Sequence, residues 1–217
     1  MRPNVTEYQL HCFAQSGNSY KAALALALVG ADWAPVPVDF FNGETRSPEY
    51  RALNAMGEAP VLVHGDLRLS QSGVILDYLA QRYREIAPGS EIERREALRW
   101  TLWDNHKLTS YVATLRFMTN FLPEAKREPA VIAFLDGRAR AAMRVLDTHL
   151  AGRDWIAADR LTTADLSCIG YLYFTDEFGV DMADYPNTAR WRDAIAALPG
   201  WKHPYALMPG HPLPVPA

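Results

Sequence analysis

The hydrophobic pattern changes its period once along the chain, near residue 85, and this change limits the fold more than any other feature. Before it, strand and helix patterns alternate in the order β-α-β-β-β-α, which is typical of a small mixed sheet covered by helices. The predicted segments are strands at Glu7–Ala14 and Ala34–Phe40, a pair of strands across Pro60–Ser70 joined by a Gly-Asp turn, and helices at Ala22–Val29 and Gln71–Tyr83.

Strand signals disappear beyond "EIAPGSE" (Glu85–Glu91), where proline and glycine indicate a linker. The tail "PGHPLPVPA" is proline-rich and is expected to lie extended on the surface. The chain is therefore predicted to hold an α/β domain at 1–85, a linker at 86–90 and an all-helical domain at 91–217. The later helical patterns cover Ile92–Phe121, Pro129–Leu150, Thr163–Phe178 and Asn187–Leu198.

Charge and cysteine content argue against several classes of function. The net charge is -3 and the densest basic run, "RREALR", is interrupted by Glu96, so neither a nucleic acid nor an anionic membrane is an expected partner. No segment approaches the ~18 apolar residues that span a bilayer, and the N-terminus lacks the apolar core of a signal peptide. Cys12 and Cys168 form no CxxC pair and the histidines are scattered. We therefore expect a cytoplasmic protein with no disulfide and no metal site.

The segment "SGNS" (Ser16–Ser19) lies directly before a strongly apolar helical pattern. The free N–H groups and the dipole at the start of a helix attract an anion or a thiolate. A thiol with a pKa of about 8.5 is mostly protonated near pH 7, and lowering that pKa by about two units takes roughly 2.7 kcal/mol. One charge-assisted hydrogen bond from a hydroxyl, together with the helix end, is of that order. Helix capping alone also explains these residues.

Two further stretches have the composition of ligand-binding turns. In "GEAPVLV", Pro60 follows Ala59 and opens a strand, where a cis peptide bond would leave the Ala59 backbone free to pair with an extended peptide. In "SQSGVIL", Gln71 and Ser72 start a helix and offer amide, hydroxyl and N–H donors to a carboxylate. Capping explains each stretch separately as well.

Taken together, these motifs resemble the glutathione transferase superfamily over almost the whole chain, from about Glu7 to Trp201. "SGNSYK" resembles the catalytic-serine loop of the serine-type bacterial, theta-, zeta- and phi-like classes, "GETRSPEYRALNAMGEAPVL" the cis-proline strand and its loop, and "LSQSGVILDYL" the γ-glutamyl-binding turn. In "LTTADL", Thr162 and Asp165 match a capping box and Leu161 and Leu166 a hydrophobic staple. "YPNTARWRDAIAALPGW" is similar to the penultimate helix of the family. The resemblance implies a thioredoxin-like α/β domain followed by an all-α helical bundle.

The resemblance also implies a role for each matched residue. Ser16 would stabilise the glutathione thiolate, and Arg46 would hold the glycine carboxylate. The other matched residues would bind the rest of the tripeptide: Ala59 and Pro60 the cysteinyl part, Gln71 and Ser72 the γ-glutamyl end.

Three positions depart from the family pattern. Thr45 stands where histidine is frequent, and Glu58 stands where glutamine is common, so its charge would repel the glycine carboxylate. Asn18 replaces the cysteine of some classes, which removes an obvious nucleophile but leaves an amide for binding. Asn18, Ser19 and Tyr8 are the alternatives to Ser16 as the group that acts on the sulfur, and Cys12 is interpreted as a core thiol.

The second substrate is expected between the two domains. Trp103, His106 and Tyr111 on the helix at Ile92–Phe121 are candidates to face it, although aromatic residues at helical spacing also form cores. The sequence therefore predicts a cytoplasmic, homodimeric detoxification enzyme that transfers glutathione, its co-substrate, to a small hydrophobic electrophile. The alternatives are a glutathione-dependent isomerase or reductase, and a non-catalytic glutathione-binding or structural protein.

Overall fold

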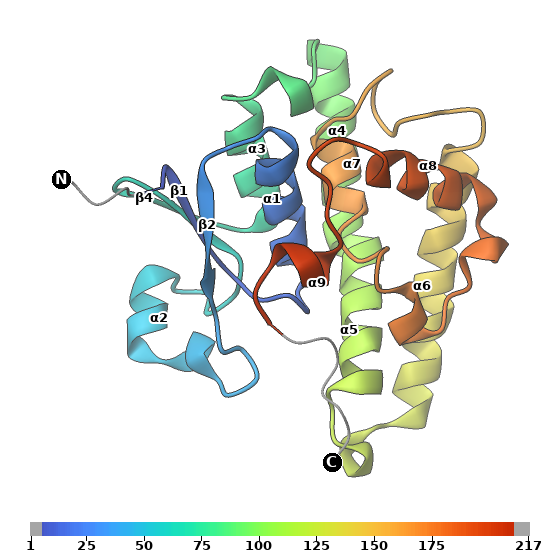
Figure 1. Ribbon diagram of the computed structural model, residues 1–217. Helices are drawn as coiled ribbons and strands as arrows, with labels where there is room; N and C mark the ends of the chain where they lie inside the picture. Colours follow the sequence, from blue (N-terminus) through green and yellow to red (C-terminus); the bar gives the residue numbers. More distant parts are fainter. Residues whose placement is uncertain (1–5, 211–217) are drawn as a thin grey trace.

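A four-stranded mixed sheet in the order β2-β1-β3-β4 forms the first part of the chain (Figure 1). The computed structural model describes residues 6–210. Strand β1 (Tyr8–Cys12) pairs in parallel with β2 (Trp33–Pro37) and antiparallel with β3 (Val61–His64), and β3 continues through a tight turn into β4 (Leu67–Ser70). The prolines of β2 lie on an edge strand, as the sequence predicts. Proline has no backbone N–H to donate, and an edge strand tolerates this because it pairs with a neighbour on one side only.

Three α-helices accompany this sheet. Helices α1 (Gly17–Leu28) and α3 (Ser72–Ala80) pack against each other, and α2 (Pro48–Leu53) lies apart from them beyond β2 (Figure 1). Helix α1 begins five residues before the predicted start at residue 22, because Ser16 caps it. The sequence analysis missed α2, a six-residue helix capped by Ser47, which is too short to show a helical period.

The second part of the chain is helical. Helix α4 (Glu91–Trp103) continues through a π-helical turn, η3 (Asp104–Leu108), into α5 (Thr109–Asn120), so the predicted helix at 92–121 is one interrupted rod. The other helices are α6 (Pro129–His149), α7 (Thr163–Cys168), α8 (Pro186–Ala196) and the unpredicted α9 (Pro204–Leu207). The short 3-10 turns are η1 (Glu44–Arg46), η2 (Arg84–Ile86), η4 (Glu124–Lys126), η5 (Thr175–Phe178) and η6 (Met182–Asp184).

The single helix predicted across Thr163–Phe178 is wrong. Helix α7 ends at Cys168, and the chain turns before the 3-10 turn η5. At this turn Gly170 passes close to α1: a Cβ there would lie 2.6 Å from Lys21 Cε and 2.8 Å from the Gly17 carbonyl oxygen. The helix therefore stops where its backbone meets α1. The predicted extended tail falls largely on residues 211–217, outside the described residues.

One buried cluster joins the two parts of the chain. It includes Leu24 of α1, Leu76 of α3 and Trp191 of α8, all fully buried. The predicted capping box of α7 is confirmed: Asp165 accepts hydrogen bonds from the Thr162 N–H (2.8 Å) and from Trp191 Nε1 (2.9 Å). The expected fold class, an α/β part with an all-helical part, is confirmed, whereas the exact domain limits stay a prediction.

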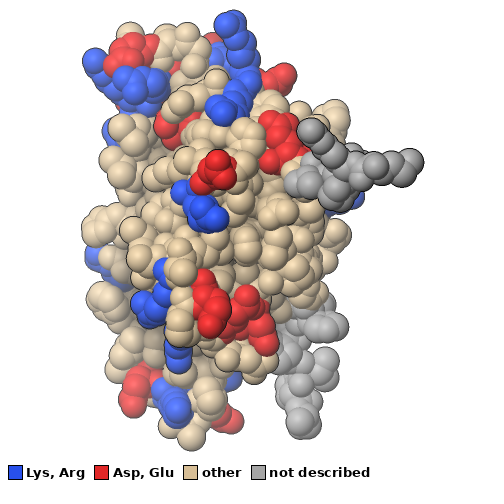
Figure 2. All heavy atoms as spheres, turned by 90° about the vertical axis from the view of Figure 1, so that its left-hand side faces the viewer, with Lys and Arg blue, Asp and Glu red and all other residues tan. Residues whose placement is uncertain are grey.

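The surface shows no field of one charge on the face drawn in Figure 2, where acidic and basic side chains alternate among neutral ones. Within residues 6–210, no helix combines the length and the apolar character that a membrane crossing needs.

Candidate active site at the amino end of helix α1

Ser16 caps helix α1 from an extended backbone conformation, with φ −88° and ψ 109°. The Ser19 N–H donates a hydrogen bond of 3.0 Å to Ser16 Oγ. The Ser16 oxygen therefore accepts the capping hydrogen bond, and its hydroxyl hydrogen can still be donated to another partner. Ser16 is only 6% exposed, yet it lines two cavities at this end of the helix.

The loop before β3 brings Glu58, Ala59 and Pro60 to the same place. The predicted cis peptide bond between Ala59 and Pro60 is present. The Glu58 carbonyl accepts hydrogen bonds from Asn54 Nδ2 (2.8 Å) and from the Tyr50 hydroxyl (3.1 Å). These two bonds hold the loop, so the backbone of Ala59 is presented in a fixed position.

The start of helix α3 completes a small polar recess of about 40 Å³ beside this loop. Gln71 has a φ of 67° and is the only described residue other than glycine in the left-handed region. Gln71 Nε2 donates to Glu58 Oε2 at 2.9 Å, and the Ser72 hydroxyl lies 3.4 Å from Asn18 Oδ1. Because the left-handed region costs about 1–3 kcal/mol for such a residue, the turn is held by its surroundings.

A larger polar cavity of about 410 Å³ extends from this recess along α1. Asn18, Glu58 and Gln71 line it from the α/β part, and Asn105 and Thr109 line it from the helical part. A cavity of this size and composition fits a small polar ligand.

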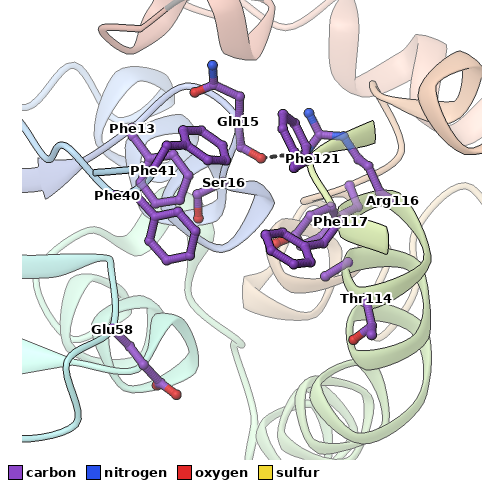
Figure 3. A pocket seen from close by; sticks show the side chains of 12 residues that line it. Phe13, Gln15, Ser16, Phe40, Phe41, Glu58, Thr114, Arg116, Phe117 and Phe121 are labelled. Carbon is purple, nitrogen blue, oxygen red and sulfur yellow. Dashed lines mark hydrogen bonds between the residues drawn. The ribbon is translucent and has the colours of Figure 1, made fainter. Parts of the chain in front are cut away.

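A second cavity of about 440 Å³ adjoins the first, shares Ser16 with it, and has aromatic side chains as half of its lining residues. In Figure 3, Phe13, Phe40 and Phe41 form one wall and face Phe117 and Phe121. The Phe13 and Phe40 rings are stacked with 4.7 Å between their centroids, and Phe41 meets Phe121 across the cavity at 4.9 Å. Because planar rings pack well against such walls, this cavity suits an apolar, preferably aromatic, molecule.

Arg116 of α5 fixes the loop that carries Ser16. It is 2% exposed and its guanidinium donates to the Gln15 carbonyl oxygen, to Glu177 and to the Tyr205 hydroxyl (3.0 Å) (Figure 3). Tyr205 in turn donates to Glu177 at 2.6 Å. The charge of Arg116 is thus neutralised within the helical part, and the arginine acts on the loop through a carbonyl oxygen.

Tyr171 closes the amino end of α1 from the helical part. It follows α7, is 8% exposed and lines both large cavities together with Ser16. Its ring covers Gly17 so closely that a Cβ at this position would lie 2.4 Å from Tyr171 Cδ2. Burial raises the pKa of Tyr171, while Arg116 and the backbone N–H groups of Asn18 and Gly17 act to lower it.

The structure brings together most of the predicted binding residues: Ser16, Asn18, Ala59, Pro60, Gln71 and Ser72. Arg46 is exposed on the 3-10 turn η1 and lines neither this recess nor the two large cavities. The alternatives Ser19 and Tyr8 are fully buried and also line none of them; burial raises the pKa of Tyr8.

The expected substrate residues Trp103, His106 and Tyr111 line neither the recess nor the two large cavities, and their role stays a prediction. Trp103 packs on Trp100, with 4.9 Å between the centroids, His106 is exposed on the π-helical turn, and the Tyr111 hydroxyl accepts a hydrogen bond from Arg138. Among residues 6–210 no group of three or more His, Cys, Asp or Glu residues is placed to hold a metal ion.

Sequence reasoning missed the aromatic walls, Arg116 and Tyr171. A signal existed for both aromatic walls, because "FF" (Phe40–Phe41) lies at the end of the predicted strand Ala34–Phe40, and Phe117 and Phe121 are four residues apart on a helix. Nothing local marks Arg116 or Tyr171, whose contacts at the site, with Gln15 and Gly17, join residues more than a hundred positions apart.

Known proteins resemble the chain in both of its parts. The family described as "Glutathione S-transferase, N-terminal domain" matches residues 8–81, and "Glutathione S-transferase, C-terminal domain" matches residues 108–199. Among curated relatives, Glutathione S-transferase F10 of Arabidopsis thaliana is 29% identical over 85% of this chain and 90% of its own. Maleylacetoacetate isomerase of Pseudomonas aeruginosa is 30% identical over 90% of this chain and 95% of its own. A crystal structure titled as a possible glutathione S-transferase from Rhodopseudomonas palustris has a TM-score of 0.82 and 32% identity, covering 92% of this chain and 98% of the other.

Proposed function

The chain belongs to the glutathione S-transferase family and is a glutathione transferase, and from this premise we propose that Ser16 activates the glutathione thiol for attack on a small hydrophobic electrophile. The observation that carries the proposal is a capping serine whose hydroxyl borders a polar and an aromatic cavity at once. A thiolate formed at this point meets the second substrate directly.

The activation step needs no general base. The Ser16 hydroxyl donates its hydrogen to the sulfur while its oxygen accepts the Ser19 N–H, and this cap polarises the hydroxyl. The amino end of α1 adds its positive dipole. A hydrogen bond to a charged group contributes about 1.5–3 kcal/mol, which corresponds to roughly one to two units of thiol pKa.

The rest of the tripeptide lies in the polar cavity. Ala59 pairs its backbone with the cysteinyl part, next to Pro60, and Gln71, Ser72 and Asn18 bind the γ-glutamyl end. Arg46, exposed on the 3-10 turn η1, is retained as the residue that holds the glycine carboxylate. No metal takes part in this proposal.

The electrophile lies among the aromatic walls. Phe13 and Phe40 offer a stacked surface beside Ser16, and Phe117 offers one from α5. Holding the two reactants side by side removes much of the entropic cost of their encounter. The thiolate attacks the electrophile directly, and no covalent bond to the enzyme forms. The alternative functions, a glutathione-dependent isomerase or reductase and a non-catalytic protein, are not favoured.

A homodimer is part of the proposal. Val74 on α3 and Leu98 and Leu102 on α4 are 50%, 55% and 60% exposed, and the two helices lie beside each other around a shallow recess of about 260 Å³. Large apolar side chains exposed on both helices favour an interaction surface here. Two buried free cysteines agree with a cytoplasmic location, which is also part of the proposal. The linker at residues 86–90 between the two domains is retained as a proposal.

The test combines a conjugation assay, using a chlorinated nitrobenzene, with calorimetric titration of glutathione. Ser16→Ala is expected to raise the pKa of the bound thiol by about one to two units and to leave glutathione affinity nearly intact. Ser19→Ala is the matched control, because its hydroxyl is fully buried and lines neither cavity. An unchanged thiol titration in Ser16→Ala contradicts the role of Ser16, and tight binding without turnover in the wild type points to a non-catalytic protein.

A further inference from the structure

Tyr171 reaches the amino end of α1 from the opposite half of the chain. Three atoms of its ring lie within 2.5 Å of the position that a Gly17 Cβ would take, so the ring lies flat on the backbone of Gly17. This placement requires glycine at residue 17, directly after Ser16. The two hydroxyl-bearing residues therefore flank the first turn of the same helix.

The hydroxyl of Tyr171 is influenced by the free amides of that turn. The backbone N–H groups of Gly17 and Asn18 act to lower its pKa, against the effect of burial. These are the groups that a bare helix end would offer to an anion. The phenol carries one hydrogen of its own, which it can donate into the two cavities that Tyr171 lines with Ser16.

Packing alone does not account for this hydroxyl. A phenylalanine would cover Gly17 with the same ring, and the buried oxygen carries a desolvation cost that a phenyl ring avoids. Its neighbours among the charged groups are Arg116 on α5, Glu58 before β3, and Asp104 on η3, which is paired with Lys21 of α1. Arg116 favours negative charge at this point, whereas Glu58 and Asp104 oppose it.

Resting on the proposed function, we propose that Tyr171 is a second catalytic hydroxyl, which donates a hydrogen bond to the glutathione sulfur together with Ser16. The sulfur then lies between a serine hydroxyl from the α/β part and a phenol from the helical part. The thiol proton leaves to solvent, and the two donors stabilise the remaining thiolate.

The experiment is Tyr171→Phe, which keeps the ring on Gly17 and removes only the oxygen. We measure the ultraviolet absorbance of the bound thiolate against pH, together with kcat and KM for the conjugation reaction. The variant is expected to raise the midpoint of the thiolate titration by about one unit, so kcat/KM falls about tenfold below that midpoint. The KM for glutathione changes little, because the tripeptide contacts elsewhere remain.

Tyr173→Phe is the matched control. Tyr173 is two residues further along, donates to the Arg192 carbonyl oxygen at 3.0 Å and lines none of the three cavities at the site, so its titration should equal that of the wild type. A thiolate titration in Tyr171→Phe that matches the wild type overturns this inference alone. A wild-type protein that binds no glutathione, or binds it without forming thiolate at neutral pH, overturns it together with the proposed function.

Discussion

Replacing Lys21 by methionine is expected to destabilise the protein more than any surface change. Lys21 of α1 is fully buried, and its Nζ donates to Asp104 Oδ2 at 2.6 Å and to Thr109 Oγ1 at 2.9 Å. Asp104 is also fully buried on the π-helical turn and accepts further hydrogen bonds from Ser167 (2.6 Å) and Thr109 (2.8 Å). Lys21→Met keeps the aliphatic stem and leaves the Asp104 charge in the core.

The size of the stability loss depends on which groups still bind Asp104 after Lys21 is replaced. Removing one partner of a buried ion pair costs about 3–5 kcal/mol, because the other charge stays without compensation. Here two hydroxyls still donate to Asp104, so the lower end of this range, about 3 kcal/mol, is expected. Against a typical total of about 5–15 kcal/mol, such a loss is a large share of the stability.

Urea denaturation followed by circular dichroism measures the loss. The double variant Lys21→Met with Asp104→Asn removes both charges and should recover at least half of it, because neither side then buries an unpaired charge. Arg94→Met is the exposed control: Arg94 pairs with Glu91 three residues away on the surface of α4, and its loss should change stability little. A single variant that loses less than about 1 kcal/mol, or a double variant no better than the single, refutes the reasoning.

Three other predictions concern the site and the core. Glu58→Gln should bind glutathione severalfold more tightly in calorimetry, since it removes a negative charge beside an anionic ligand, and equal affinity would contradict a repulsive role. Gly17→Ala should displace the Tyr171 ring, lower kcat and cost about 1–3 kcal/mol of stability, whereas an active and equally stable variant would contradict the close contact. Burial raises the pKa of the Cys12 thiol from 9.0 to about 12. The unfolded chain therefore loses a proton that the folded chain keeps as pH rises from about 9 to 12, so stability should fall over this window, and less steeply in Cys12→Ala.

The sequence predicts the fold well where the pattern is local. Alternating valines mark the edge strand, the Gly-Asp pair marks the turn between β3 and β4, and the Thr162–Asp165 spacing marks the start of α7. The prediction is wrong where a contact between residues far apart in the sequence determines the local structure. Helix α7 ends early because Gly170 meets α1, some 150 residues away along the chain, and no property of Thr163–Phe178 itself reports this.

The same division holds for the candidate site. Ser16, Gln71 and Ser72 start helices, so their residue types alone suggest ligand-binding turns. The direction in which a helix presents its aromatic residues depends on its packing. The sequence therefore singled out Trp103 and Tyr111 but not Phe117, which lies on the same rod and lines the aromatic cavity.

The contacts between the two parts of the chain converge on one short segment. Arg116 holds the Gln15 carbonyl oxygen, Tyr171 covers Gly17, and Asp104 binds Lys21, so the helical part contacts the chain immediately before and after Ser16. Arg116 comes from the same helix as Phe117, which lines the aromatic cavity. The position of Ser16 thus depends on the element that receives the electrophile. A substitution that shifts α5 should therefore alter thiol ionisation as well as electrophile binding, so the two substrates are coupled through this helix.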